Sequence, residues 1–331
     1  MKQFKLFALL ATTGLLLTGC GKNVDPVIKW DPNKTYNVGI CQLVQHVALD
    51  AATQGFKDKL KEALGDKVTF DEQNAAGDSA TCVTIANSFV SKKVDLIMAN
   101  ATPALQAAAN STVDIPVLGT SITDYGSALN LKNFDGVVGG NVSGTCDLAP
   151  LDEQAKMMTD LFPEANKFGI LYCSAEANSK YQADNVVKEL KNLKANATVN
   201  RYTFADSNDI ATNLDKMVGD KVDVLFIPTD NTCASNVSII DSKCSAANIP
   251  VFCGEEGICA GCGAFTLSIS YYKIGQKTGE MAARIIKEGA HVSKMNVEFD
   301  DQPVKKYNPT ICERLGITNI PADFEAIAQP E

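Results

Sequence analysis

The chain has 331 residues, a formal net charge of −9 at pH 7 and 45% apolar residues. An acidic chain without a basic cluster argues against binding to nucleic acid and against adhesion to anionic lipid. The apolar content is typical of a globular protein, and the length exceeds the ~250–300 residues at which a single core normally splits into domains.

The first residues have the pattern of an export signal. Lys2 and Lys5 precede an apolar run, Leu6 to Leu17, which is too short for a membrane-spanning helix of ~20 residues. The run ends in Leu17-Thr18-Gly19-Cys20, which resembles a bacterial lipobox. We expect residues 1–19 to be a signal peptide and Cys20 to carry lipid such as palmitate. The alternative is an ordinary signal peptide that ends near a cysteine.

Residues 20–35 contain Pro, Asn, Gly and charged residues without a period, and predict a tether between the anchor and the body. The only Trp of the chain, Trp30, lies in this segment, and we assign it no binding role.

The body from residue 36 onward contains an internal repeat. Each pair of matching segments is short and rich in β-branched residues, which predicts buried strands. The pairs are Val38-Gly39-Ile40 with Phe168-Gly169-Ile170, residues 94–97 with residues 222–225, and residues 114–118 with residues 248–252.

Helical patterns lie between these strands. Apolar residues recur at spacings of three and four in residues 49–64, 79–90, 179–193, 209–217 and 231–247. Alternation of strand and helix predicts an α/β fold with two similar doubly wound parallel-sheet lobes joined by a three-strand hinge. We expect lobe 1 to span residues 36–145 plus about 271–290. Lobe 2 then spans residues 146–270 plus part of 291–331, with crossings near 145, 270 and 290.

The loops that follow the predicted strands are polar and should face a cleft, because ligands of open α/β sheets bind outside the carboxyl ends of the strands. Lobe 1 contributes Gln45, His46, Thr102, Ser121 and Thr123. Lobe 2 contributes Glu176, Asn178, Ser179, Asp230, Asn231 and Glu255.

Hydroxyl groups and helix N-termini suit a carboxylate, and the acidic residues of lobe 2 suit an ammonium group. No Arg lies in these loops, which makes a strongly anionic ligand unfavourable. The pattern predicts a site for a small zwitterion such as an amino acid. The simpler interpretation of Thr102, Ser179 and Asp230 is that they cap helices.

Several motifs in one order carry a resemblance to a known family. They are Ile40-Cys41-Gln42-Leu43-Val44-Gln45-His46, residues 99–103, residues 174–179, Pro228-Thr229-Asp230-Asn231, Gly254-Glu255-Glu256 and residues 271–275. From about Tyr36 to Ile317 the chain resembles the bacterial ABC-transporter substrate-binding lipoproteins linked to tryptophan and tyrosine uptake. Cys41, Cys173 and Cys253 depart from the usual pattern of that family.

The resemblance implies a periplasmic-binding-protein type I-like fold with a closing cleft and an aromatic amino acid as ligand. It also implies ABC permease subunits as partners and a monomer anchored by lipid to the outer face of the bacterial cytoplasmic membrane. An aromatic ligand needs apolar or stacking walls. The candidates are Tyr125, Tyr181, Phe265, Tyr271 and Tyr272, of which Tyr271 is favoured because it follows a predicted crossover strand near the hinge.

Other functions are less consistent with the sequence. The mature body has only two histidines, His46 and His291, and no recognisable set of nucleophile and base, so we predict no enzyme and no cofactor. Cys259 and Cys262 form one tight pair, whereas structural zinc sites generally show two, so we predict no metal. The alternatives for this pair are a Cys259–Cys262 disulfide and two free thiols. A ligand-sensing or adhesin lipoprotein on the same fold remains the alternative function.

Overall fold

The computed structural model of the protein describes residues 26–300 and 302–328. The expected signal peptide, the lipidated Cys20 and the first part of the tether lie outside the described residues. No helix within the described ranges is long and apolar enough to cross a membrane. The remaining tether packs on the body, because Trp30 stacks on Tyr36 with ring centroids 5.3 Å apart.

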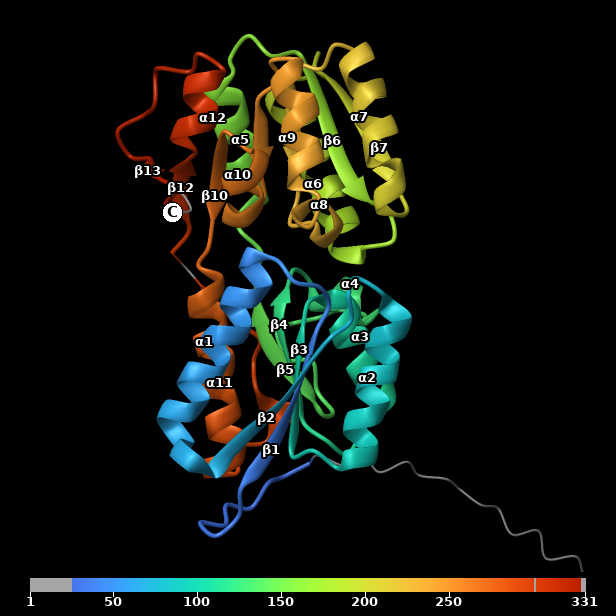
Figure 1. The fold of residues 1–331 in the computed structure, drawn as a ribbon, viewed down its shortest axis with the longest axis vertical. Coiled ribbons are helices and arrows are strands. Elements are labelled where there is room, and N and C mark those ends of the chain that lie inside the picture. The colour runs from blue at the N-terminus through green and yellow to red at the C-terminus, as the bar shows by residue number, and fades with distance from the viewer. Residues whose placement is uncertain (1–25, 301, 329–331) are drawn as a thin grey trace, which may run out of the picture.

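Lobe 1, at the bottom of Figure 1, is built on a six-stranded sheet in the order β11-β5-β4-β3-β1-β2. All its strand pairs are parallel. The strands are β1 (Tyr36–Gln42), β2 (Val68–Asn74), β3 (Leu96–Asn100), β4 (Val117–Ile122), β5 (Val142–Cys146) and β11 (Glu298–Phe299).

Helices cover both faces of this sheet, because successive strand residues point to opposite faces. Leu96 and Met98 of β3 pack with α1 (Val47–Leu64) and α11 (Tyr271–Glu288). Ile97 and Ala99 pack with the other helices of the lobe. These are α2 (Ser79–Lys92), α3 (Thr102–Ser111) and α4 (Tyr125–Ala128), and short 3₁₀ turns lie at Gly65–Lys67 and Val292–Lys294.

Lobe 2 repeats this plan with a seven-stranded sheet in the order β13-β12-β10-β9-β8-β6-β7. Its strands are β6 (Lys167–Cys173), β7 (Thr198–Phe204), β8 (Val224–Ile227), β9 (Val251–Cys253), β10 (Phe265–Ser268), β12 (Val304–Tyr307) and β13 (Glu325–Ala326). Only β12 runs antiparallel to its neighbour β10. The order of β2-β1-β3-β4-β5 therefore recurs as β7-β6-β8-β9-β10, as the internal repeat predicts.

The helices of lobe 2 also divide between the two faces. One core contains α5 (Leu151–Leu161), α6 (Ala177–Leu193) and α12 (Pro309–Arg314). The other contains α7 (Ile210–Gly219), α8 (Asn231–Ala234), α9 (Val237–Ala246) and α10 (Glu256–Cys262), and a 3₁₀ turn lies at Ser207–Asp209.

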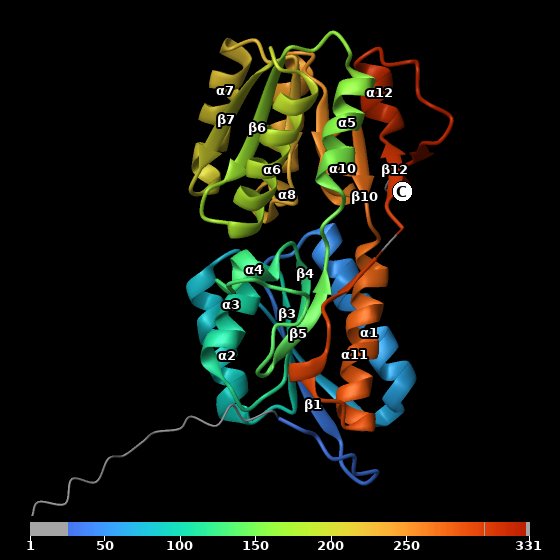
Figure 2. The same ribbon diagram turned by 180° about the vertical axis from the view of Figure 1, so that it is seen from behind.

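Three connections join the lobes (Figure 2). The first two leave β5 for α5 and β10 for α11, close to the expected crossings at 145 and 270. The third, expected near 290, lies between Phe299 and Val304. The chain stays in lobe 1 up to Phe299 because Glu298 and Phe299 pair with Thr145 and Cys146 of β5.

The expected single helix over residues 231–247 is wrong, because α8 and α9 are separate. Ser235 Oγ donates to the Asn231 carbonyl, and Asn236 Nδ2 donates to the Thr232 carbonyl. Side chains of this kind compete with the backbone for helical carbonyls and end the first helix.

Candidate functional site

A narrow cavity lies between the two lobes, at the carboxyl ends of the strands. Side chains from both lobes and from the hinge line it: His46, Leu49, Ser121, Asp147, Asn178, Thr229, Asp230, Asn231, Ala234, Glu255, Ile258 and Tyr271. The lobes approach so closely that little more than a water-sized space remains. A wider mouth, which Leu43, Pro103 and Glu176 help to line, opens beside it.

The charges that line the cavity all have one sign. Asp147, Asp230 and Glu255 contribute three buried carboxyl groups, and no Lys or Arg is among the lining residues that the structure describes. A buried charge needs a partner of the opposite sign. The cavity is therefore complementary to a ligand that carries positive charge.

Asp230 begins α8 and accepts two backbone hydrogen bonds. Its Oδ1 accepts from Cys233 N at 2.8 Å, and its Oδ2 accepts from Cys173 N at 2.6 Å. Complete burial raises the pKa of Asp230, and the nearby charge of Glu176 raises it further. The expected capping role of Asp230 is confirmed, and the same carboxyl group also lines the cavity.

Glu255 holds the equivalent place at the start of α10. Its carboxyl oxygens accept from Gly257 N at 2.6 Å and from Ile258 N at 2.5 Å. Burial raises the pKa of Glu255 to about 7. Because Ile258 lines the cavity as well, the position of α10 determines where two of the lining side chains lie, Glu255 and Ile258.

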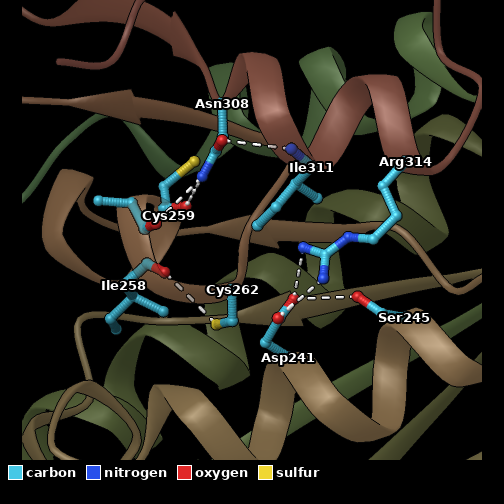
Figure 3. A network of polar contacts seen from close by, with 9 residues as sticks. Asp241, Ser245, Ile258, Cys259, Cys262, Asn308, Ile311 and Arg314 are labelled. Carbon is cyan, nitrogen blue, oxygen red and sulfur yellow. Dashed lines mark hydrogen bonds and ion pairs between the residues drawn. The ribbon is translucent and has the colours of Figure 1, made fainter. Parts of the chain in front are cut away.

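The C-terminal segment fixes α10 from behind, as Figure 3 shows. Asn308 Nδ2 donates to the carbonyl groups of Cys259 and Ala260 at 3.0 and 3.1 Å. Arg314 of α12 makes two hydrogen bonds to Asp241 of α9, at 3.0 and 2.9 Å. These contacts tie α9, α10 and α12 together, so that the cavity wall is attached to a braced unit.

The hinge contributes Asp147 and Tyr271. The Tyr271 hydroxyl donates to Asp147 Oδ2 at 2.8 Å, and Thr123 Oγ1 donates to Asp147 Oδ1 at 2.9 Å. Asp147 lies in the first connection between the lobes, and Tyr271 follows the second. Burial raises the pKa of Asp147. The contact joins two hinge segments directly beneath the cavity.

A chain of hydrogen bonds from Glu176 fixes the protonation of His46. Asn231 Nδ2 donates to Glu176 at 2.6 Å, so Asn231 Oδ1 faces His46 Nε2 at 3.2 Å and accepts its hydrogen. Burial lowers the pKa of His46, which keeps the ring neutral. His46 Nδ1 is then a buried acceptor without a hydrogen-bond partner.

The lobe 1 side of the cleft has a strained backbone. Ala101 has φ of 89° and Ser121 has φ of 57°, values that residues other than Gly rarely adopt. Ser121 lies where the pairing of β4 with β5 shifts register between Gly119 and Ile122. Bulges of this kind re-aim side chains beside binding sites. Ser121 Oγ is buried and has no hydrogen-bond partner.

Thr102 begins α3, and no side chain caps that helix. The expected capping role of Thr102 is wrong, because Ala101 holds the cap position. Thr102 Oγ1 is buried without a partner, like Ser121 Oγ. Of these two hydroxyl groups, only that of Ser121 belongs to a residue that lines the cavity.

Two further polar contacts join the lobes. Thr123 Oγ1 lies 3.3 Å from Thr229 Oγ1 and 3.3 Å from Gln182 Nε2. Within lobe 2, Gln182 also donates to Thr229 Oγ1 at 2.5 Å. Together with the contact between His46 and Asn231, they indicate that the lobes are in a closed arrangement.

Most of the predicted site residues lie at the cleft. His46, Ser121, Asn178, Asp230, Asn231, Glu255 and Tyr271 line the cavity, and Glu176 lines the mouth. Thr102, Thr123 and Ser179 are buried but do not line the cavity. Gln45 is exposed and lines neither the cavity nor the mouth. Asn178 and Ser179 do not cap α6, because the helix starts at Ala177 and Glu176 holds the cap position.

Only one of the five aromatic candidates lines the cavity. Tyr271 does so, whereas Tyr125 and Phe265 belong to the lobe cores. Tyr272 is exposed, and its hydroxyl group donates to Asp58 at 3.0 Å. Tyr181 is partly buried against a core of lobe 2.

Sequence reasoning missed Asp147. It follows β5, the strand that has no partner among the matched segments of the repeat, so no expected loop contained it. The sequence feature that could have indicated Asp147 is a carboxylate within the crossover expected near residue 145.

The ten cysteines from Cys41 to Cys312 are buried and have free thiols. Among the described residues, no group of three or more His, Cys, Asp or Glu side chains is arranged to hold a metal ion.

Comparison with known proteins gives one consistent result. Residues 37–325 match a model of the ABC transporter substrate binding protein family. The chain is 35% identical over 334 residues to a protein from Clostridioides difficile described as a tyrosine-binding protein, covering 98% of this chain and 95% of the relative.

Two solved structures are similar over most of the chain. One is the ABC domain from Streptococcus pneumonia in complex with L-Trp, with 30% identity, a TM-score of 0.81 and coverage of 86% of this chain and 97% of that chain. The other is the ligand-free, open structure of a substrate-binding protein with adhesive properties from Clostridium difficile. It has 36% identity, a TM-score of 0.67 and coverage of 89% and 100%. The lower score against the open structure agrees with a closed arrangement of the lobes in this chain.

Proposed function

Because the chain belongs to the ABC transporter substrate-binding protein family, we propose that its cleft captures a free aromatic amino acid and presents it to ABC permease subunits. The observation that carries the ligand class is the cavity itself. Three carboxyl groups and several unpartnered polar atoms face one narrow space that no Lys or Arg lines among the described residues. An amino acid zwitterion supplies the missing positive charge.

The proposed orientation follows from the distribution of donors and acceptors. The ammonium group lies toward lobe 2, near Asp230, Glu255 and the free Oδ1 of Asn178. The carboxylate lies toward lobe 1, where Ser121 Oγ offers a donor. Each charged group of the ligand then meets its complement on a different lobe.

The side chain of the ligand needs an apolar surface. Leu49, Ile258 and the ring of Tyr271 provide one. Because the space in this arrangement is only water-sized, the ligand-bound lobes must lie further apart than they do here. An aromatic side chain gains most from such a surface, and the relatives described as tyrosine-binding and as bound to L-Trp support this ligand class.

The mechanism proposed is hinge closure. A ligand that contacts both lobes binds the closed state better than the open state and shifts the population toward it. The contacts of Thr123 with Thr229 and Gln182 contribute to the closed state without requiring a ligand. The permease then recognises the closed monomer.

We test the ligand by thermal shift on residues 21–331, which include every described residue. L-tyrosine, L-phenylalanine and L-tryptophan are compared with tyramine, which lacks the carboxylate, and with N-acetyl-L-tyrosine, which lacks the ammonium group. A ligand at ~100 times its Kd adds ~2.7 kcal/mol to stability. We expect a saturable rise with at least one amino acid and none with N-acetyl-L-tyrosine. Stronger binding of tyramine than of tyrosine would contradict the carboxylate subsite.

Anchoring is a separate proposal. A lipid on Cys20 would hold the protein at the outer face of the cytoplasmic membrane without a spanning helix. Mass spectrometry of the membrane-extracted protein should find acyl chains on Cys20 and no residues 1–19. A Cys20→Ser variant should be released into the soluble fraction.

An adhesive role, which is described for the open relative, is the second function proposed for a surface lipoprotein of this fold. It would use outer lobe surfaces rather than the cleft. Adhesion that survives in a variant unable to bind amino acids would separate the two roles.

A further inference from the structure

The acidic cavity needs positive charge in order to close. Asp147, Asp230 and Glu255 are almost completely buried in the closed arrangement, with 4%, 1% and 2% of their surface exposed. Their hydrogen-bond partners within the described chain are backbone N–H groups and hydroxyl groups, and none of these carries a full positive charge. A carboxylate that loses water without gaining a cation either finds a ligand cation or takes up a proton.

The groups around Glu255 do not supply a cation. Asp147 and Tyr271 face it from the hinge, and Cys259 faces it from its own helix. Lys306 of β12 does carry a positive charge, but its Nζ pairs with Glu256 at 2.6 Å, and neither residue lines the cavity.

The groups around Asp230 are also neutral or acidic. Glu176 faces it from the start of α6, the thiols of Cys173 and Cys233 lie on adjoining elements, and Ser179 contributes a hydroxyl group. From lobe 1, His46 reaches this side through Asn231, and Asp50 lies near His46. Because burial lowers the pKa of His46, its ring brings no charge at neutral pH.

Two unpartnered atoms indicate that a ligand completes this site. Ser121 Oγ and Asn178 Oδ1 are buried, line the cavity through their residues and have no hydrogen-bond partner. Resting on the proposed function, we infer that protons and the ligand's ammonium group are alternative partners of Asp230 and Glu255. Binding of the ammonium group in the closed cleft therefore displaces protons, and acid alone closes the empty cleft.

The direction of the pH effect follows from linkage. Burial raises the pKa of Glu255 to about 7 and raises that of Asp230. The inference requires that opening of the lobes exposes these carboxyl groups to water and lowers their pKa, so that the empty protein gains protons when it closes. Between pH 8 and pH 6.5 the ratio of closed to open empty protein should rise about fourfold for each carboxyl group of closed-state pKa near 7. His46 titrates below this range.

The ammonium arm of the test is titration calorimetry with L-tyrosine at pH 7. Buffers of low and high ionisation enthalpy, phosphate and Tris, are compared. We expect a binding enthalpy that depends on the buffer and corresponds to release of up to about half a proton per carboxyl group. Tyrosine affinity should fall from pH 8 to pH 6.5. Tight binding at pH 8 with no proton release and no pH dependence would overturn the inference and leave the proposed function intact.

The proton arm needs no ligand. Small-angle X-ray scattering of the ligand-free protein should show a smaller radius of gyration at pH 6.5 than at pH 8. The double variant Asp230→Asn, Glu255→Gln should lose this dependence, and Glu256→Gln should keep it. A radius that is independent of pH would overturn the inference even if no aromatic amino acid binds. Absence of amino acid binding with acid compaction intact would overturn only the proposed ligand.

Discussion

At the scale of single residues, the cavity is lined by side chains that also have structural roles. Asp230 caps α8, accepts from Cys173 N and lines the cavity. The sequence predicted both roles as alternatives for Asp230, and the structure shows that the capping carboxylate is the one that faces the cavity. A substitution at such a position changes stability and affinity together, so a control must separate the two effects.

We expect Asp230→Ala to weaken tyrosine binding by tenfold or more, about 1.4 kcal/mol, because it removes the proposed partner of the ammonium group. Loss of the cap should also lower the free energy of unfolding by about 1 kcal/mol. Calorimetry and denaturant unfolding measure the two effects. The control is Asp124→Ala, which removes the cap of the equally short α4, where Asp124 accepts from Ser127 N at 2.6 Å. Equal affinity losses in both variants would remove Asp230 from the binding role.

Ser121 combines a strained backbone with a free hydroxyl group. Ser121→Ala removes the hydroxyl and keeps the strain of the left-handed backbone, whereas Ser121→Gly removes the hydroxyl and relieves the strain. We expect both variants to lose tyrosine affinity and the Gly variant to be about 1 kcal/mol more stable than the Ala variant. Lys93→Gly is the control, since Lys93 has φ of 54° at the end of α2 and lies outside the cavity. Unchanged affinity in both Ser121 variants would show that strain alone explains this position.

At the scale of elements, α1 and α11 connect the hinge with the cleft. His46 precedes α1 and Tyr271 begins α11, and both residues line the cavity. The two helices lie in close contact because each has a glycine where it meets the other, Gly55 in α1 and Gly275 in α11. A Cβ on Gly55 would lie 2.1 Å from the Tyr272 carbonyl oxygen, and a Cβ on Gly275 would lie 2.0 Å from the Ala52 carbonyl oxygen.

Gly275→Ala should therefore force the helices apart. We expect a loss of about 1–3 kcal/mol in the free energy of unfolding, because the obstructing atoms belong to the backbone and cannot rotate away. Tyrosine affinity should fall as well, since His46 and Tyr271 move relative to each other. The control is Gly219→Ala at the end of α7, where no atom lies within 4 Å of the added Cβ. A neutral Gly275→Ala would mean that the two helices separate without cost.

The elements also show what the sequence could and could not predict. The buried strands and the amphipathic helices were found, because a β-branched run or a spacing of three and four is a local signal. The edge strands β2 and β7 carry no such signal, since much of each is exposed. The limits of α6 and the break between α8 and α9 depend on contacts of Glu176, Ser235 and Asn236, which involve tertiary structure or competition with the backbone.

The cleft was predictable as a set of loops but not as a geometry. The alternation of parallel strands and helices is enough to bring Ser121, Asp230 and Glu255 to one edge of the sheets. Gln45 lies three residues after β1, as Asp230 lies three residues after β8, yet Gln45 is exposed to solvent. Asp147 was missed because it follows β5, and neither β5 nor its counterpart β10 is among the segments matched in the sequence.

At the scale of the whole molecule, the cysteines report on both lobes. Cys41, Cys82 and Cys146 are buried in lobe 1, and seven more are buried in lobe 2: Cys173, Cys233, Cys244, Cys253, Cys259, Cys262 and Cys312. A thiol reagent reaches them only when a lobe opens locally or unfolds. Labelling resolved by mass spectrometry therefore measures the stability of each lobe separately in one sample.

A ligand that bridges the lobes should slow labelling in both. At a tyrosine concentration of 100 times its Kd, openings that abolish binding become about 100-fold rarer. Because the proposed ammonium partners lie in lobe 2 and the proposed carboxylate partners in lobe 1, unfolding of either lobe destroys the site. We expect the same slowing for Cys82 and for Cys244, which lie on helices far apart in the chain. Denatured protein without reductant should show all ten thiols as reactive. Slowing confined to the thiols of lobe 2 would mean that lobe 1 contributes no binding free energy, and the bridging orientation would then be wrong.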